Sequence, residues 1–173
     1  RQDEDHVRRT GRGLRPGDAY VLNAPYDGGT HLPDVTVVMP VFAEESDAAP
    51  AWFVAARGHH ADIGGIAPGS MPPGSRTLDE EGVLLDNVLL VDEGQLREAD
   101  LRARLSSGRW PSRNVDQNIA DLKAQIASCA RGASELRRIA AEQGRAVVDA
   151  YMGHVQDHAE AAVRALLDRL ADG

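Results

Sequence analysis

One stretch of sequence organises the N-terminal part of this chain: Val35-Thr36-Val37-Val38-Met39-Pro40-Val41-Phe42. It is rich in β-branched residues and almost entirely apolar, which is typical of a strand buried on both faces. After a polar turn, Ala51-Trp52-Phe53-Val54-Ala55-Ala56 predicts a returning strand. We expect the two strands to pair as a hairpin, which brings the residues before the first strand close to those after the second.

Polar residues bracketed by glycines lie at both of these points. Gly28-Gly29-Thr30-His31-Leu32-Pro33-Asp34 precedes the first strand, and Gly58-His59-His60-Ala61-Asp62-Ile63-Gly64-Gly65 follows the second. The hairpin would place His31 and Asp34 at the same edge of the sheet as the second cluster. Imidazole and carboxylate are ligands for zinc, manganese and iron, and metal ligands commonly converge from separate segments. The sequence therefore predicts a divalent metal site (Mn, Zn or Fe) at this edge.

The adjacent histidines of the second cluster differ in what they can do. Residues that alternate along a strand face opposite sides, so one of His59 and His60 can complete the metal set while the other orients a ligand or binds substrate. Asp62 can orient a ligand imidazole or cap the turn before Gly64. The alternative for the whole set is that these side chains hydrogen-bond to the backbone near tight turns.

The composition indicates a globular protein that does not bind nucleic acid or membranes. Apolar residues make up 42% of the 173 residues and charged residues 27%. A net charge of −8 and a pI near 5.2 disfavour an electrostatic grip on nucleic acid or anionic lipid. A single cysteine, Cys129, fits a reducing compartment, and no run approaches the roughly 20 apolar residues of a membrane span. We expect a cytoplasmic protein, and the missing initiator Met indicates a piece of a longer chain.

The chain changes character near residue 110, which predicts an α+β fold. Residues 1–110 form a β-rich part that carries the candidate metal site. A further strand is expected at 19–22, one strand or two from the apolar runs 83–85 and 88–91, and a short helix at 95–106. The Gly- and Pro-rich loop 64–76 is expected to line or cover the site.

Residues 111–173 form a helical part. Two apolar stripes at spacings of three and four predict amphipathic helices that meet at Gly144. They form a helical hairpin or one long kinked helix. Each stripe must pack against the other, the sheet or a partner chain, either a twin or a different subunit.

Several runs of the sequence resemble the hydantoinase B/oxoprolinase family. The similarity covers nearly the whole chain. The matching runs are Leu14-Arg15-Pro16-Gly17-Asp18, residues 22–34, Arg57 to Gly65, Pro68-Gly69-Ser70-Met71-Pro72, Glu80-Glu81-Gly82-Val83, Arg113-Asn114, Asp121-Leu122-Lys123-Ala124-Gln125 and Tyr151-Met152.

The resemblance implies an ATP-dependent enzyme with a partner. The family includes hydantoinases and 5-oxoprolinases and is related to acetone and acetophenone carboxylases. Its members work with a hydantoinase A-like ATPase subunit or domain that binds ATP and phosphorylates the substrate, which fits the lack of a phosphate-binding loop in this sequence. In the carboxylase branch a His-x-x-Asp pair and a later His hold a metal, which implicates His31, Asp34 and His59. The family pattern favours His59 over His60, because the ligand stands three residues before an Asp, here Asp62.

The first hypothesis is a metal-dependent component that opens a cyclic amide, either a hydantoin or 5-oxoproline. His60 and Asp62 would orient ligands or move protons. The alternative is an ATP-dependent ketone carboxylase component that uses the same site. A third hypothesis is a non-catalytic truncated remnant that acts as an assembly module. The short length favours this remnant, and so does Asn23-Ala24-Pro25, where the family usually has Asn-Asp-Pro.

Overall fold

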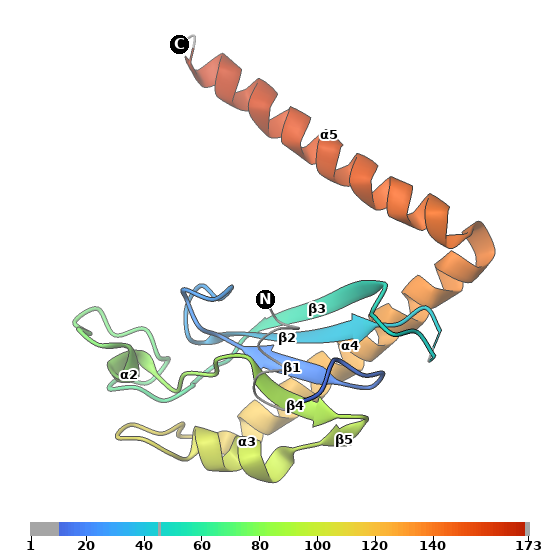
Figure 1. Ribbon diagram of the computed structural model, residues 1–173. Coiled ribbons are helices and arrows are strands. Elements are labelled where there is room, and N and C mark those ends of the chain that lie inside the picture. Colours follow the sequence, from blue (N-terminus) through green and yellow to red (C-terminus); the bar gives the residue numbers. More distant parts are fainter. Residues whose placement is uncertain (1–10, 45, 172–173) are drawn as a thin grey trace. The chain divides into compact units, whose positions relative to one another are not determined.

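A five-stranded antiparallel sheet forms the centre of the N-terminal part, in the order β3-β2-β1-β4-β5 (Figure 1). The computed structural model describes residues 11–44 and 46–171. The strands are β1 (Ala19–Leu22), β2 (Asp34–Val41), β3 (Trp52–His59), β4 (Val88–Asp92) and β5 (Gln95–Leu96). The helices are α2 (Leu78–Glu81), α3 (Glu98–Leu105), α4 (Val115–Gln143) and α5 (Arg145–Ala171). The predicted α+β class is confirmed.

The predicted hairpin is formed by β2 and β3. Its register pairs Val41 with Trp52 at one end and Asp34 with His59 at the other. Beyond the last pair, the backbone N–H of His60 donates to the carbonyl oxygen of Pro33 at 2.8 Å. The hairpin therefore brings the two polar clusters of the sequence to one edge of the sheet.

The core lies between the sheet and the first half of α4. Val35 and Val37 of β2 are fully buried, and Leu122 and Cys129 of α4 are at most 2% exposed. The Cys129 thiol lies 3.7 Å from the carbonyl oxygen of Val37. Burial raises the pKa of this thiol, so Cys129 is a packing residue that does not readily form the reactive thiolate.

The runs 83–85 and 88–91, expected to give one strand or two, give one, β4, and residues 83–85 are not in a strand. The buried Asn23 side chain forms hydrogen bonds with the backbone of residues 83–85: its Nδ2 donates to the carbonyl of Val83, and its Oδ1 accepts from the N–H of Leu85. The Asn23 side chain thus makes the hydrogen bonds to residues 83–85 that the backbone of a neighbouring strand would make. The single helical turn α2 was not expected from the sequence.

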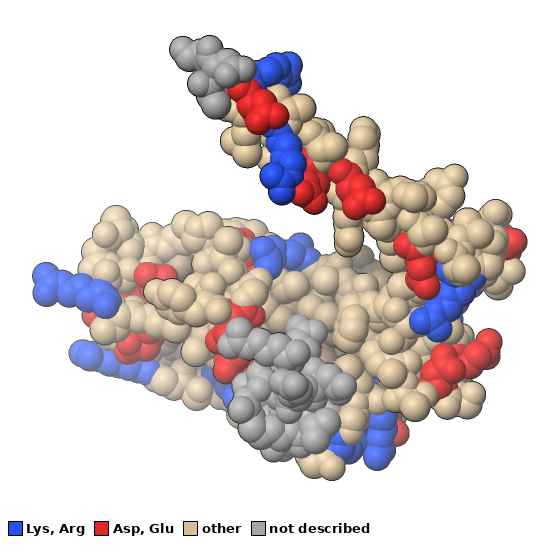
Figure 2. All heavy atoms as spheres, turned by 45° about the horizontal axis from the view of Figure 1, so that its top comes forward, with Lys and Arg blue, Asp and Glu red and all other residues tan. Residues whose placement is uncertain are grey.

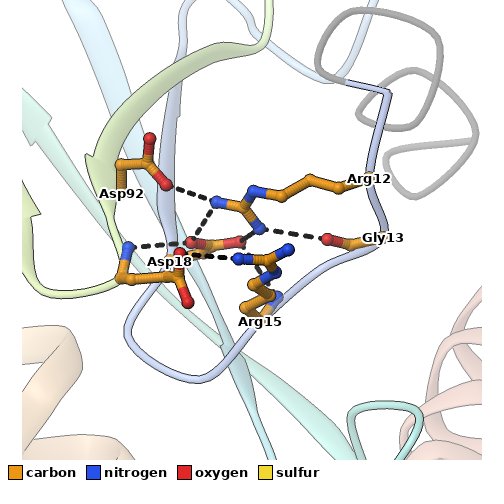
Figure 3. Close-up of polar contacts among 6 residues, drawn as sticks. Arg12, Gly13, Arg15, Asp18 and Asp92 are labelled. Carbon is orange, nitrogen blue, oxygen red and sulfur yellow. Dashed lines mark hydrogen bonds and ion pairs between the residues drawn. The ribbon is translucent and has the colours of Figure 1, made fainter.

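A buried ion pair ties the segment before β1 to the turn between β4 and β5 (Figure 3). Asp18 accepts two hydrogen bonds from the Arg12 guanidinium, at 2.9 and 3.0 Å, and one each from the backbone N–H groups of Arg15 and Glu93. Arg12 also pairs with Asp92. Burial acts to raise the pKa of Asp18, but the hydrogen bonds from Arg12 and the backbone outweigh it and hold this pKa below its usual value.

The chain divides into two units, Arg1–Ala133 and Ser134–Gly173. The helical run begins at Val115, close to the expected change near residue 110, and the first half of α4 belongs with the sheet. The second unit holds the end of α4 and all of α5, which meet at Gly144 (φ +88°), as predicted. No helix in the described part of the chain is long and apolar enough to cross a membrane.

Candidate functional site

Asp34 joins the two predicted histidine ligands at the edge of the hairpin. Its Oδ2 lies 2.8 Å from Nδ1 of His31, and its Oδ1 lies 2.8 Å from Nδ1 of His59. These hydrogen bonds, that from His59 first, hold the pKa of Asp34 below its usual value. A carboxylate accepts hydrogen bonds only, so the Nδ1 atoms are the donors, and Nε2 is the nitrogen of each ring that Asp34 does not contact.

The donor types of this triad suit a divalent metal. Two imidazoles and a carboxylate lie within one hydrogen bond of each other, and both imidazoles are 57% exposed. In the present arrangement the donors pair with each other: no group of three His, Cys, Asp or Glu side chains in residues 11–44 and 46–171 is arranged to hold an ion. A metal here would have to replace the hydrogen bonds that now join the donors.

His60 points the opposite way from His59 and is buried, with 1% exposure. Its Nδ1 accepts from Nδ2 of Asn118 at 3.0 Å, and its Nε2 donates to Oε1 of Gln125 at 3.1 Å. Both ring nitrogens are therefore occupied by α4 side chains. The alternation predicted for the adjacent histidines is what the strand produces.

Asp62 lies between the hairpin and the start of α4. Its Oδ1 accepts from the N–H of Gly64 at 3.0 Å, which is the turn cap considered from the sequence. Its Oδ2 accepts from Nη1 of Arg113 at 2.7 Å. Burial acts to raise the pKa of Asp62, yet the backbone hydrogen bonds from Arg113 and Gly64, with the Arg113 side chain, lower it overall.

Gly64 and Gly65 let the chain pass close to its neighbours. Both have positive φ, +93° and +89°. A Cβ on Gly64 would lie 2.4 Å from the carbonyl oxygen of Trp110, and one on Gly65 would lie 2.7 Å from that of Glu80. Since both obstacles are backbone atoms, a side chain at either position requires the loop to move.

Arg57 holds the loop that carries His31. It donates from Nε to Oγ1 of Thr36, from Nη1 to Oγ1 of Thr30 and from Nη2 to the carbonyl of Gly28. Arg57 of β3 thereby anchors the loop before β2 to the hairpin.

Four polar residues around these clusters were not predicted from the sequence to have a role: Arg57, Arg113, Asn118 and Gln125. Three of them stand within, or at the end of, runs that resemble the family: Arg57, Arg113 and Gln125. The presence of polar residues inside these runs was the signal in the sequence that could have pointed to their roles. Ala24, the position of the departure, is 5% exposed, and its carbonyl accepts from the N–H groups of Asp27 and Gly29.

Residues 4–173 match the family model described as hydantoinase B/oxoprolinase. The chain belongs to the hydantoinase B/oxoprolinase family, as its motifs predicted.

Individual relatives agree with this assignment. A 5-oxoprolinase of Dictyostelium discoideum is 43% identical over 161 residues, which are 93% of this chain and 12% of that protein. The acetophenone carboxylase delta subunit of Aromatoleum aromaticum is 32% identical over 92% of this chain and 22% of that subunit. The crystal structure of an ATP-dependent caprolactamase from Pseudomonas jessenii matches with a TM-score of 0.75 and 27% identity, over 96% of this chain and 28% of that one. The chain thus spans less than a third of each.

Proposed function

We propose that the chain is part of a metal-dependent enzyme that opens a cyclic amide, a hydantoin or 5-oxoproline, in an ATP-dependent reaction. The observation that carries the proposal is the triad of His31, Asp34 and His59, which the β2–β3 register assembles at an exposed edge. The 43% identity to a 5-oxoprolinase supports the cyclic amide as the substrate class.

His31, Asp34 and His59 would hold the divalent metal, manganese, zinc or iron. A metal bound there supplies a Lewis acid that polarises a carbonyl or phosphoryl oxygen, or lowers the pKa of water. Without a metal, Asp34 accepts a hydrogen bond from Nδ1 of each imidazole, and a bound ion would replace these two hydrogen bonds. His60 and Asp62 support the residues that would bind the metal. His60 joins the end of β3 to α4 through its hydrogen bond to Gln125, and Asp62 joins the following turn to Arg113.

Metal content of the purified chain, measured by elemental mass spectrometry, tests the site. We expect near-stoichiometric manganese, zinc or iron in the natural sequence and its loss in His31→Ala. His158→Ala is the matched control, since His158 is an exposed histidine on α5. A chain that takes up no metal on addition, or a His31→Ala variant that retains it, would overturn the proposal and favour the non-catalytic remnant.

The proposed partner is a hydantoinase A-like ATPase subunit or domain, which would bind ATP and activate the substrate. Support comes from the caprolactamase, whose description names it ATP-dependent. Mixing the chain with such a partner should produce ATP hydrolysis that depends on the cyclic amide. ATP hydrolysis that stays the same without the amide would contradict the pairing.

A second candidate is ATP-dependent ketone carboxylation at the same site. The 32% identity to the acetophenone carboxylase delta subunit favours it. Bicarbonate separates the two reactions, because a carboxylase consumes it and an amide-opening enzyme does not.

A further inference from the structure

A small cavity lies between the residues around α2 and the loop that joins α3 to α4. Its volume is about 430 Å³, which is within the range of small-molecule sites. Four apolar side chains and two charged ones contribute to its wall. They are Leu78, Val83, Leu84, Trp110, Asp79 and Arg109.

Both walls of this cavity are hydrogen-bonded to the segment that directly follows β3. On one side the N–H of Gly65 donates to the carbonyl of Trp110 at 2.9 Å. On the other, the N–H of Ile66 donates to the carbonyl of Glu80 at 2.8 Å. The segment after His59 and His60 therefore links the two walls. Figure 1 shows α2 and the loop between α3 and α4 on the side of the sheet where β3 ends.

Among the residues that the structure describes, neither of the two charged side chains that border the cavity pairs with a group of opposite charge. The Arg109 guanidinium lies 4.4 Å from the centroid of the Trp110 ring, and no carboxylate within residues 11–44 and 46–171 pairs with it. Stacking by its face leaves the N–H edge of the guanidinium able to bind a planar carboxylate. Asp79, which borders the same cavity, also accepts no hydrogen bond from the described residues.

We propose that this cavity binds a small molecule with a carboxylate and an N–H group on a short apolar frame. Arg109 takes the carboxylate, Asp79 accepts from the N–H, and Trp110 and Leu84 contact the frame. The inference rests on the proposed function and reduces its two candidate substrates to one. Of the two cyclic amides, 5-oxoproline carries a carboxylate and hydantoin does not, so Arg109 favours 5-oxoproline.

Calorimetric titration of the full chain in EDTA tests this assignment with three probes. They are 5-oxoproline, 2-pyrrolidone, which is the same ring without the carboxylate, and 3-oxocyclopentanecarboxylate, which keeps the carboxylate and the ring carbonyl and has CH2 in place of the N–H. We expect 5-oxoproline to bind about tenfold more tightly than either of the others, the factor typical of one charge-assisted hydrogen bond.

Two variants locate the preference. Arg109→Gln should bind 5-oxoproline no more tightly than 2-pyrrolidone, and Asp79→Asn should reduce the advantage of 5-oxoproline over 3-oxocyclopentanecarboxylate. Arg104→Gln is the matched control, because Arg104 is an exposed arginine of α3 outside the cavity wall and should leave all three affinities unchanged.

Equal binding of 5-oxoproline and 2-pyrrolidone to the natural sequence, no binding of any probe, or a preference that survives in Arg109→Gln would overturn the inference. Since the titration is run without metal, its failure is separate from that of the triad, which metal content tests.

Discussion

The two adjacent histidines at the end of β3, His59 in the strand and His60 directly after it, have opposite environments because the alternation of the strand continues through them. His59 is exposed and lies beside Asp34, whereas His60 is buried between Asn118 and Gln125. Successive strand residues face opposite sides, so the exposed edge receives one imidazole and the interface with α4 receives the other. One residue can therefore bind an ion while its neighbour supports the fold.

At the residue scale, we predict that Asp18→Asn costs about 3–5 kcal/mol of unfolding free energy at pH 7, as expected when one partner of a buried ion pair is removed. The Asp18 side chain is fully buried beside Arg12. Urea unfolding followed by circular dichroism measures the loss. Asp100→Asn is the control, because Asp100 is exposed and pairs with Arg97 at the surface, where the effect should stay within about 0.5 kcal/mol.

The same pair predicts a pH dependence. The pKa of Asp18 is lowered in the folded chain, so its contribution is fully present above the unfolded value of about 3.9. It is lost as the pH falls below that value and through the lower folded pKa. The stability difference between the natural sequence and Asp18→Asn should therefore narrow as unfolding is repeated at decreasing pH below about 4. A constant difference down to the acid transition would contradict this account.

At the element scale, Gln125 connects α4 to the hairpin. Its Nε2 donates to the carbonyls of Val35 and Ala56, each at 2.9 Å, and its Oε1 accepts from His60. A single side chain on the helix thereby contacts both strands and the buried imidazole. This explains why the helix that carries the core stripe also has a buried polar residue.

We predict that Gln125→Leu destabilises the chain by about 1–3 kcal/mol, because it leaves the buried N–H of His60 without an acceptor. Thermal unfolding by calorimetry measures the effect. Gln117→Leu, on the exposed side of the same helix, removes only a bond to Asp121 and should cost less than about 0.5 kcal/mol. Equal losses in the two variants would show that the buried network contributes little.

At the scale of the whole molecule, α5 exposes more apolar surface than a solvated helix needs. Val163, Leu166, Leu167 and Leu170 are 57%, 49%, 58% and 68% exposed. Charged side chains of both signs are interspersed along the rest of this helix (Figure 2), with ion pairs such as Arg164 to Glu160 at 2.7 Å. An apolar stripe of this kind is typical of a helix that packs against another chain or domain.

We predict that the chain by itself self-associates through α5. Light scattering coupled to size exclusion should give a mass above that of the monomer, and Leu166→Glu with Leu170→Glu should reduce it. Glu substitutions at two charged positions of the same helix, Arg164 and Arg169, form the matched control and should leave the mass unchanged. A monomeric mass for the natural sequence would contradict the prediction.

Local patterns in the sequence determined much of this protein. The apolar run at 35–42 and its returning partner predicted the hairpin, and hairpin pairing alone brought His31 and Asp34 to the edge where β3 ends. The break at Gly144 and the α+β class followed from periodicity and from glycine. These features depend on neighbours in the chain, which a sequence displays directly.

The tertiary structure decided what depends on residues far apart in the chain. Asn23 binds the backbone at Val83 and Leu85, Arg12 pairs with both Asp18 and Asp92, and Gln125 with Asn118 binds His60. Both walls of the cavity beside Arg109 are hydrogen-bonded to backbone groups that follow β3. No periodicity encodes such contacts, since a buried polar group can be satisfied by any donor or acceptor that the fold brings within reach.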